Sequence, residues 1–113
     1  MKWFAVTYIY KIICGEGSHS PQFNEQTRLL SALNLKSALK KANLNAQKFN
    51  VPFTNCEGKL VKWKFIAVAS IYEIEAPEDG VEVNAKIVEP QSVDSYLKKL
   101  GYRKKSLINQ ILP

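Results

Sequence analysis

Histidine, cysteine and methionine are scarce in this chain of 113 residues, which has one histidine, two cysteines and one methionine. Cys14 and Cys56 lie far apart in sequence, and the single histidine, His19, lies in a loop of glycine and serine. Zinc sites show clustered ligand spacing, and a hydrolase nucleophile elbow reads Gly-x-Ser-x-Gly. Neither pattern is present, so we expect no catalytic residue, no metal site and no cofactor.

Long apolar runs are also absent, because Lys11 and Lys64 interrupt the two best candidates. A membrane-spanning helix needs about 18 consecutive apolar residues, so no membrane segment is expected. The N-terminal residues lack the apolar segment and cleavage site of a secretory signal, which favours the cytoplasm and reduced thiols. Hydrophobic residues make up 46% and charged residues 23% of the chain, a composition typical of a globular protein.

Charge is present but unevenly distributed along a chain of net charge +6. Residues 1–89 hold eleven basic and nine acidic residues, whereas residues 90–113 hold five basic residues and one acidic residue. The basic tail consists of Lys98, Lys99, Arg103, Lys104 and Lys105, a second basic stretch contains Lys36, Lys40, Lys41 and Lys48, and the acidic bend contains Glu73, Glu75, Glu78, Asp79 and Glu82. Separated charges of this kind can steer a charged partner, although such charges more often form only a solvated surface.

Alternating patterns predict an antiparallel hairpin at the N-terminus. Residues 2–14 alternate two apolar faces rich in aromatic and β-branched types, which is typical of a strand. Turn-forming residues 15–21 follow, and residues 23–32 form a second extended run. Residues 24–28 are polar on both faces of the strand, which indicates an edge strand, where charge protects the exposed backbone.

A helix is expected after Asn34, whose side chain suits an N-cap. The apolar residues at helical spacing are Leu35, Ala38, Leu39, Ala42, Ala46 and Phe49. This helix should end before Pro52. Residues 51–55 then predict a short strand, joined by the turn at Glu57-Gly58 to a long strand over 60–72.

The long strand places Val61, Trp63, Phe65, Ala67, Ala69 and Ile71 on one face. Lys62 and Lys64 lie on the other face at first, but beyond Phe65 both faces are apolar, which predicts a strand covered on both sides or a bend. Trp63 and Phe65 could stack on nucleic-acid bases. Because they face away from the lysines on a regular strand, the core interpretation is favoured.

A turn over 76–80 and alternation over 81–87 predict a returning strand. Ser92 then caps a short helix that should end at Gly101, and residues 102–113 should fray or dock on another surface. The order is β-β-α-(β)-β-β-α, an α+β fold with a mostly antiparallel sheet of four to five strands and one main helix on a face. We expect a single domain over 1–89 and a basic helical extension over 90–113.

Four separated blocks carry a family resemblance: Trp3-Phe-Ala5, the helix with Ala38 and Ala42, Asn55-Cys-Glu-Gly58 leading into Val61-Lys-Trp-Lys-Phe65, and Asp79-Gly-Val-Glu-Val83. In their order and spacing the chain resembles the small bacterial family catalogued as domain of unknown function 4288, over about residues 2–88. This resemblance implies a fold but no activity. Residues 89–113 extend beyond the usual module.

The sequence therefore predicts a non-enzymatic binding protein, most concretely an immunity-type or inhibitor protein that neutralises a bacterial toxin. Either the basic tail or the acidic bend would form its partner-binding face, because charge sets the rate of association. The alternative is a nucleic-acid-binding module that uses the tail and the helix face of Lys36, Lys40 and Lys41. An enzyme is the third hypothesis, and a pocket gathering His19 with Cys14 or with several acids would favour it.

Overall fold

The N-terminal alternation forms a long antiparallel hairpin in the computed structural model, which describes residues 1–49, 52–54 and 57–112. Strand β1 (Lys2–Cys14) pairs with β2 (Gln22–Ala32) from Lys2↔Ala32 to Ile12↔Gln22. On its other side β1 pairs antiparallel with β4 (Leu60–Ile74). The predicted strands over 2–14 and 23–32 are confirmed, and β2 lies at the sheet edge as its polarity indicated.

The sheet has the order β2-β1-β4-β3, and a helical segment connects its two halves. This segment contains α1 (Leu35–Asn45) and the short 3-10 helix η1 (Ala46–Phe49). Strand β3 (Phe53–Thr54) pairs with Leu60 and Val61 of β4, which confirms the expected short strand at these two positions. The rest of that prediction, at Val51, Asn55 and the Cys56 turn, lies outside the described residues.

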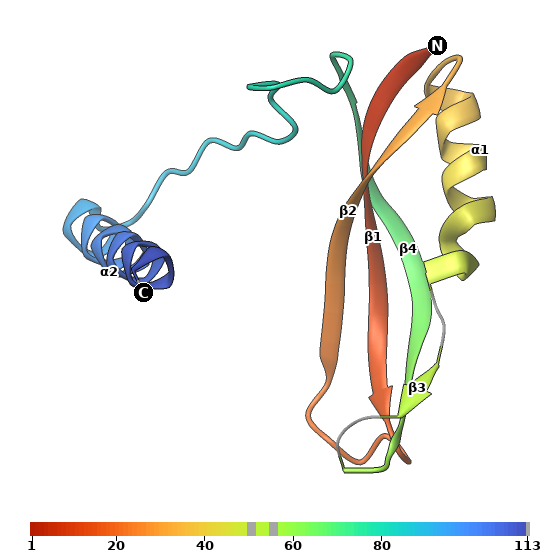
Figure 1. Cartoon of the computed structure of the whole chain (residues 1–113), viewed down its shortest axis with the longest axis horizontal. Helices are drawn as coiled ribbons and strands as arrows, with labels where there is room; N and C mark the ends of the chain where they lie inside the picture. The colour runs from red at the N-terminus through yellow and green to blue at the C-terminus, as the bar shows by residue number, and fades with distance from the viewer. Residues whose placement is uncertain (50–51, 55–56, 113) are drawn as a thin grey trace.

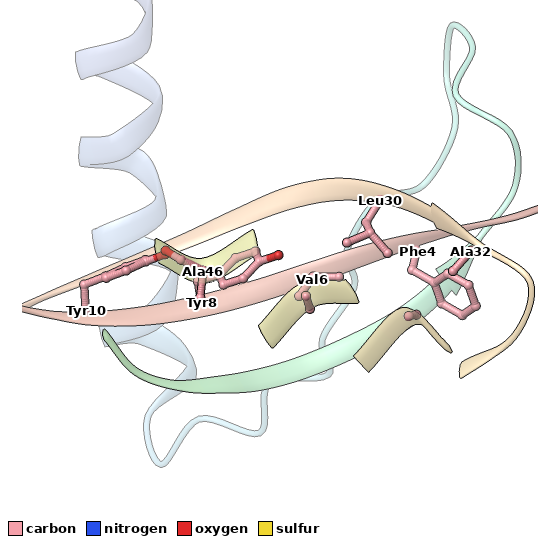
Figure 2. Close-up of a cluster of buried hydrophobic side chains, with 9 residues drawn as sticks. Phe4, Val6, Tyr8, Tyr10, Leu30, Ala32 and Ala46 are labelled. Atoms are coloured by element: carbon pink, nitrogen blue, oxygen red, sulfur yellow. The ribbon is translucent and has the colours of Figure 1, made fainter. Parts of the chain in front are cut away.

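The core lies between one sheet face and α1, as Figure 1 and the close-up in Figure 2 show. Alternation along β1 directs Phe4, Val6, Tyr8 and Tyr10 to this face, where each is at most 2% exposed. Against them pack Leu30 and Ala32 from β2 and a stripe of small residues, Ala38, Ala42 and Ala46. The aromatic side chains therefore fill a space that the alanines leave open beneath the helix.

Helix α1 begins where the sequence predicts, since the Asn34 side chain accepts a hydrogen bond from the Ser37 amide at 2.8 Å. The predicted apolar stripe is only partly correct. Its alanines are buried, but Leu35 is 58% and Leu39 45% exposed. Three small residues suffice for the contact with aromatic strands, so the two leucines stay at the border of the helix.

A hydrogen bond links β1 to η1 across the core. The Tyr10 hydroxyl donates it to the carbonyl oxygen of Ala46 at 2.6 Å. Burial raises the pKa of Tyr10 and of Tyr8 above the ordinary value of 10.0, and Arg28 lowers both in part. The Arg28 guanidinium lies 3.7 Å from the centre of the Phe49 ring and covers this end of the core.

Strand β4 departs from regular alternation at two places. Its pairing with β1 shifts register between Thr7 and Tyr8 and again between Ile9 and Tyr10. The β4 residues that pack on the core are consequently Trp63, Phe65, Val68 and Ile71, which pair with Ile12, Tyr10, Tyr8 and Val6. The prediction that Ala67 and Ala69 share this face is wrong, because each β-bulge adds one residue and moves the side chains that follow to the other face of the sheet. Trp63 and Phe65 do pack on the core while Lys62 and Lys64 are exposed.

Two predictions for the C-terminal part are wrong. Residues 81–87 form no strand: a turn closes where the Val81 amide donates to Glu78 at 3.2 Å, and the chain then leaves the sheet without a partner strand (Figure 1). The last helix is not short, because α2 runs over Val93–Ile111. Gly101 does not adopt the positive φ of a helix stop, so the helix continues through it.

The α+β class and the antiparallel sheet are confirmed, but the molecule is not uniformly compact. Figure 1 shows α2 standing away from the sheet at the end of an extended segment. The radius of gyration is 18.0 Å, against about 13 Å for a compact domain of 100 residues. Residues 75–112 therefore form an arm beside a body made of residues 1–74.

Candidate functional site

All five residues of the predicted basic tail lie on α2. The helix begins at Ser92, whose hydroxyl accepts a hydrogen bond from the Ser95 amide at 3.2 Å. Asp94 stands in the first turn, where a negative charge favours the helix dipole. The basic residues Lys98, Lys99, Arg103, Lys104 and Lys105 follow and are all exposed. The cap at Ser92 thus sets where the helix that carries the basic residues begins.

The same helix carries an apolar stripe that is interrupted only at Lys104. At 3.6 residues per turn one face collects Val93, Tyr96, Leu97, Leu100, Leu107, Ile108 and Ile111. Lys104 lies within this stripe, while Lys98, Lys99, Arg103 and Lys105 lie on the remaining surface. No residue of α2 is buried, and Leu97, for example, is 54% exposed. A helix with this division of surface is suited to a hydrophobic groove rimmed by acidic groups.

The acidic bend gathers around a shallow hollow at the end of β4. Glu73, Glu75, Glu78 and Asp79 line it together with Glu82, and its volume is about 360 Å³. Glu73 also forms an exposed ion pair with Lys2 at 3.5 Å. The bend lies where the arm leaves the body, whereas the basic helix lies at the far end of the arm (Figure 1). The two charged surfaces are thus separate.

The lysines of α1 form a third charged surface, which lies apart from the basic residues of α2. Lys36 and Lys40 are exposed, and Lys41 donates a hydrogen bond of 2.8 Å to the Ser31 carbonyl. Helices α1 and α2 stand on opposite sides of the sheet in Figure 1. The two basic surfaces that were predicted to share a nucleic acid are therefore not continuous.

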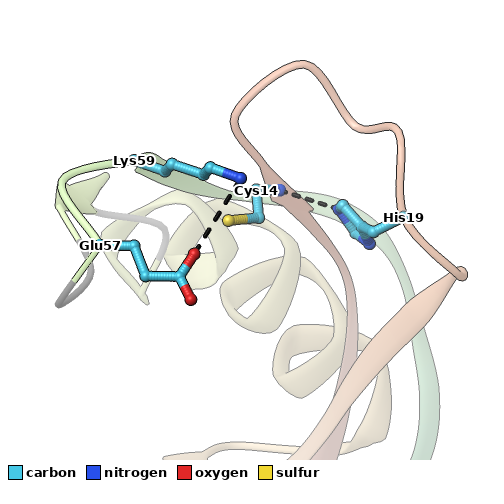
Figure 3. Close-up of polar contacts among 4 residues, drawn as sticks. All are labelled: Cys14, His19, Glu57 and Lys59. Carbon is cyan, nitrogen blue, oxygen red and sulfur yellow. Dashed lines mark hydrogen bonds and ion pairs between the residues drawn. The ribbon is translucent and has the colours of Figure 1, made fainter.

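A pocket at the loop end of the β1–β2 hairpin brings His19 close to Cys14 (Figure 3). Its volume is about 640 Å³, and Glu57 and Lys59 line its opposite side. Those two form an exposed ion pair at 4.0 Å. The sequence could name such a pocket only as a condition for an enzyme, because it does not show where the loop folds. The available signal was Gly15 and Gly17, whose positive φ angles of 59° and 82° turn the loop back onto the strand end.

The hydrogen bonds of His19 are those of a loop anchor. Its Nε2 atom accepts from the Cys14 backbone amide at 3.0 Å, and its Nδ1–H donates to the Ser20 carbonyl at 2.9 Å. Both ring nitrogens are thus engaged with backbone, and the neutral ring carries its proton on Nδ1. Proton transfer with a substrate would first have to break one of these bonds. The pocket is therefore lined by Cys14 and by a His19 ring whose two nitrogens both bond to backbone groups.

Two further properties concern only the residues that the structure describes. No group of three or more histidine, cysteine, aspartate or glutamate side chains is arranged to hold a metal ion among them. Within the same residues, none of the helices has both the length and the apolar composition to cross a membrane.

Comparison with known proteins identifies one family, over residues 3–85 of the chain. No curated protein and no solved structure matches the chain. The family match begins at residue 3 in β1 and ends at residue 85 in the arm, so it includes the sheet, α1 and the acidic bend but not α2. It confirms the resemblance inferred from the four sequence blocks. The chain belongs to the family described as Domain of unknown function (DUF4288), whose match covers residues 3–85.

Proposed function

We propose that this protein is a non-enzymatic binding protein that recognises another protein through α2. The observation that carries this proposal is the helix itself: 19 residues, none of them buried, with an apolar stripe and basic residues around it. In proteins most of the stability of a helix comes from tertiary packing of its apolar face. An apolar stripe that the body leaves uncovered is explained if a partner protein covers it.

The partner we propose is an acidic protein with a hydrophobic groove, most concretely a bacterial toxin that this chain neutralises in the cytoplasm as an immunity-type inhibitor. Inhibition by steric blocking requires only a complementary face and no chemistry. Lys98, Lys99 and Arg103 would accelerate encounter with an acidic surface, while the apolar stripe would slow dissociation. The acidic bend is the second candidate face, for a basic partner.

The experiment is co-expression with a toxin-like protein encoded beside this gene, followed by growth and binding measurements. Two α2 variants are compared, Lys98→Glu/Lys99→Glu and Leu97→Asp/Leu100→Asp. Lys62→Glu/Lys64→Glu is the matched control, because it makes the same charge change on β4. We expect both α2 variants to lose protection and the control to keep it. Equal protection by all three variants would contradict the proposal.

Nucleic-acid binding is a second candidate function, favoured by the four basic residues that α2 exposes outside its apolar stripe. A labelled single-stranded RNA and a DNA duplex are titrated at low and high salt. Phosphate binding predicts an affinity that falls steeply as salt rises, and the Lys98→Glu/Lys99→Glu variant should abolish it. Absence of any shift at low salt removes this candidate.

An enzyme ranks third, and the pocket with Cys14 and His19 is the observation in its favour. It ranks below the other two because the contact between these residues runs through the Cys14 backbone amide, so it positions the loop. If Cys14→Ser and His19→Asn left toxin protection unchanged, the pocket would have no part in the proposed function. Loss of protection in Cys14→Ser, with folding intact, would favour chemistry at the thiol.

A further inference from the structure

Strand β4 has a free edge along most of its length. One side pairs with β1, but on the other side β3 pairs only with Leu60 and Val61 among the described residues. From residue 62 to residue 74 this edge therefore presents backbone amides and carbonyls without a described partner strand. The stretch 66–72 contains no charged side chain. Natural sheets protect such an edge with charge, proline, bulges or cover, and residues 66–72 have neither charge nor proline.

An apolar groove runs beside that free edge. Leu35, Lys36 and Leu39 of α1 form one wall, and residues 68–71 of β4 form the other. Its volume is about 630 Å³. The two leucines are the members of the α1 stripe that the core leaves exposed. The groove thus offers both backbone hydrogen bonds and an apolar surface to an added strand.

The arm contains a segment with the pattern of the missing strand. Residues 81–88 alternate Val81, Val83, Ala85 and Ile87 with Glu82, Asn84, Lys86 and Val88. In the structure this segment makes no strand, Val83 is 48% exposed and Ile87 is fully exposed. Its alternation matches what an edge strand needs, because one side would face the groove and the other would face water.

We propose that residues 81–88 of one copy add as a fifth strand, antiparallel, to the free edge of β4 in a second copy. The second copy returns the same segment, so that the exchange closes with two-fold symmetry. Val81, Val83, Ala85 and Ile87 then lie in the groove beside Leu35 and Leu39. On pairing, the backbone groups and apolar side chains of residues 81–88 leave water and contact the other copy.

The direction of the arm favours a second copy over the same chain. After the turn at Gly80 the segment leads away from its own β4 (Figure 1), and the radius of gyration of 18.0 Å reflects that extension. Pro77 lies in the hinge, where it biases Ala76 toward an extended backbone. An extended hinge carries the strand outward, and a reciprocal exchange is the low-cost way for such an arm to become paired.

The test is the molar mass of the full chain in solution, by size-exclusion chromatography with light scattering at micromolar concentration and without any partner. The chain mass is 12.8 kDa, and we expect twice that value. A monomeric mass overturns the proposal, including the case in which the strand folds back on its own β4. Because no partner is present, this result is independent of whether α2 binds a toxin.

Variants identify the contact within the dimer. Val83→Pro removes a backbone donor from the added strand and should halve the mass, with near-UV circular dichroism unchanged because Val83 lies outside the core. Gln91→Pro, in the same arm beyond the strand, is the matched control and should remain dimeric. Leu97→Asp/Leu100→Asp should also remain dimeric. A Val83→Pro dimer, or a Leu97→Asp/Leu100→Asp monomer, overturns the strand exchange.

Discussion

The body and the arm of this protein acquire their structure in different ways. In the body, a face of aromatic strand residues is buried against the alanines of α1, and eleven hydrophobic residues are buried among those that the structure describes. In the arm, every residue from 75 to 112 is exposed except Val81, which is half-buried. Burial of apolar side chains stabilises the body, whereas α2 has no buried residue and has only local interactions such as its N-cap at Ser92. Substitutions in the arm should therefore leave the stability of the body unchanged.

Both tryptophans, Trp3 and Trp63, belong to the body. Their fluorescence therefore follows unfolding of the sheet, whereas far-UV circular dichroism also includes α2. If the two regions are independent, the two signals give different denaturation midpoints, which is the usual sign of a transition that is not two-state. Coincident midpoints would instead show that α2 and the body unfold together.

The largest expected effect is that of truncating a core aromatic. Phe4→Ala should lower the free energy of unfolding of the body by about 3–5 kcal/mol, the usual cost of deleting a buried aromatic ring. The matched change in the arm, Leu100→Ala, should alter it by less than about 0.5 kcal/mol. Urea unfolding followed by tryptophan fluorescence measures both. A large effect of Leu100→Ala would show that the arm packs on the body.

The next effect concerns the buried hydrogen bond between Tyr10 and Ala46. Tyr10→Phe removes the hydroxyl that donates to the Ala46 carbonyl, and Ala46 is fully buried. Loss of this hydrogen bond should cost about 0.5–1.5 kcal/mol. Tyr102→Phe is the control, because the Tyr102 side chain is exposed on α2 and should be neutral. If the two variants unfold at the same urea concentration, the hydrogen bond does not stabilise the body.

Loss of a helix cap should act differently in the two regions. Asn34→Ala removes the cap of α1 and should lower the stability of the body by about 1 kcal/mol. Ser92→Ala removes the corresponding cap of α2 and should reduce helicity in far-UV circular dichroism without shifting the fluorescence midpoint. A fluorescence shift in Ser92→Ala would break the distinction between body and arm.

The smallest effect is a decline in the stability of the body at alkaline pH. Burial raises the pKa of Tyr10 above 10.0, so the neutral phenol is favoured more in the folded than in the unfolded chain. The resulting stabilisation is complete below pH 10.0 and is lost as the pH rises through the raised value. Urea midpoints measured across this range should fall less in Tyr10→Phe than in the natural chain. An equal fall would assign the decline to other groups.

Local patterns predicted the elements of the body well. The alternation of residues 2–14 requires one apolar face of β1, and Asn34 supplies a local cap, so both elements could be placed from neighbouring residues alone. The polar edge at 24–28 likewise indicated the position of β2. The inward face of β4 could not be predicted beyond Phe65, because the two bulges arise from pairing with β1 and all the nearby residues are apolar.

The arm was predicted less well, for a related reason. The alternation over 81–87 describes a strand that needs a partner, and a pattern does not say whether a partner edge is present. Gly101 was interpreted as a helix stop, but a stop requires a positive φ, and the spacing of Leu107, Ile108 and Ile111 continues the helix instead. The basic residues of the candidate site were found from composition, whereas the His19 pocket depends on a loop that closes in three dimensions.

The alanine stripe of α1 has a consequence for which substitutions the chain tolerates. Ala38, Ala42 and Ala46 are completely buried, and they set the separation between the helix and the aromatic strand. In a saturation library these three positions should accept only glycine, alanine and serine, because a larger side chain overpacks the contact. Exposed neighbours such as Lys40 and Leu44 should accept almost any residue. Purifying selection in α1 would then act most strongly on its smallest side chains.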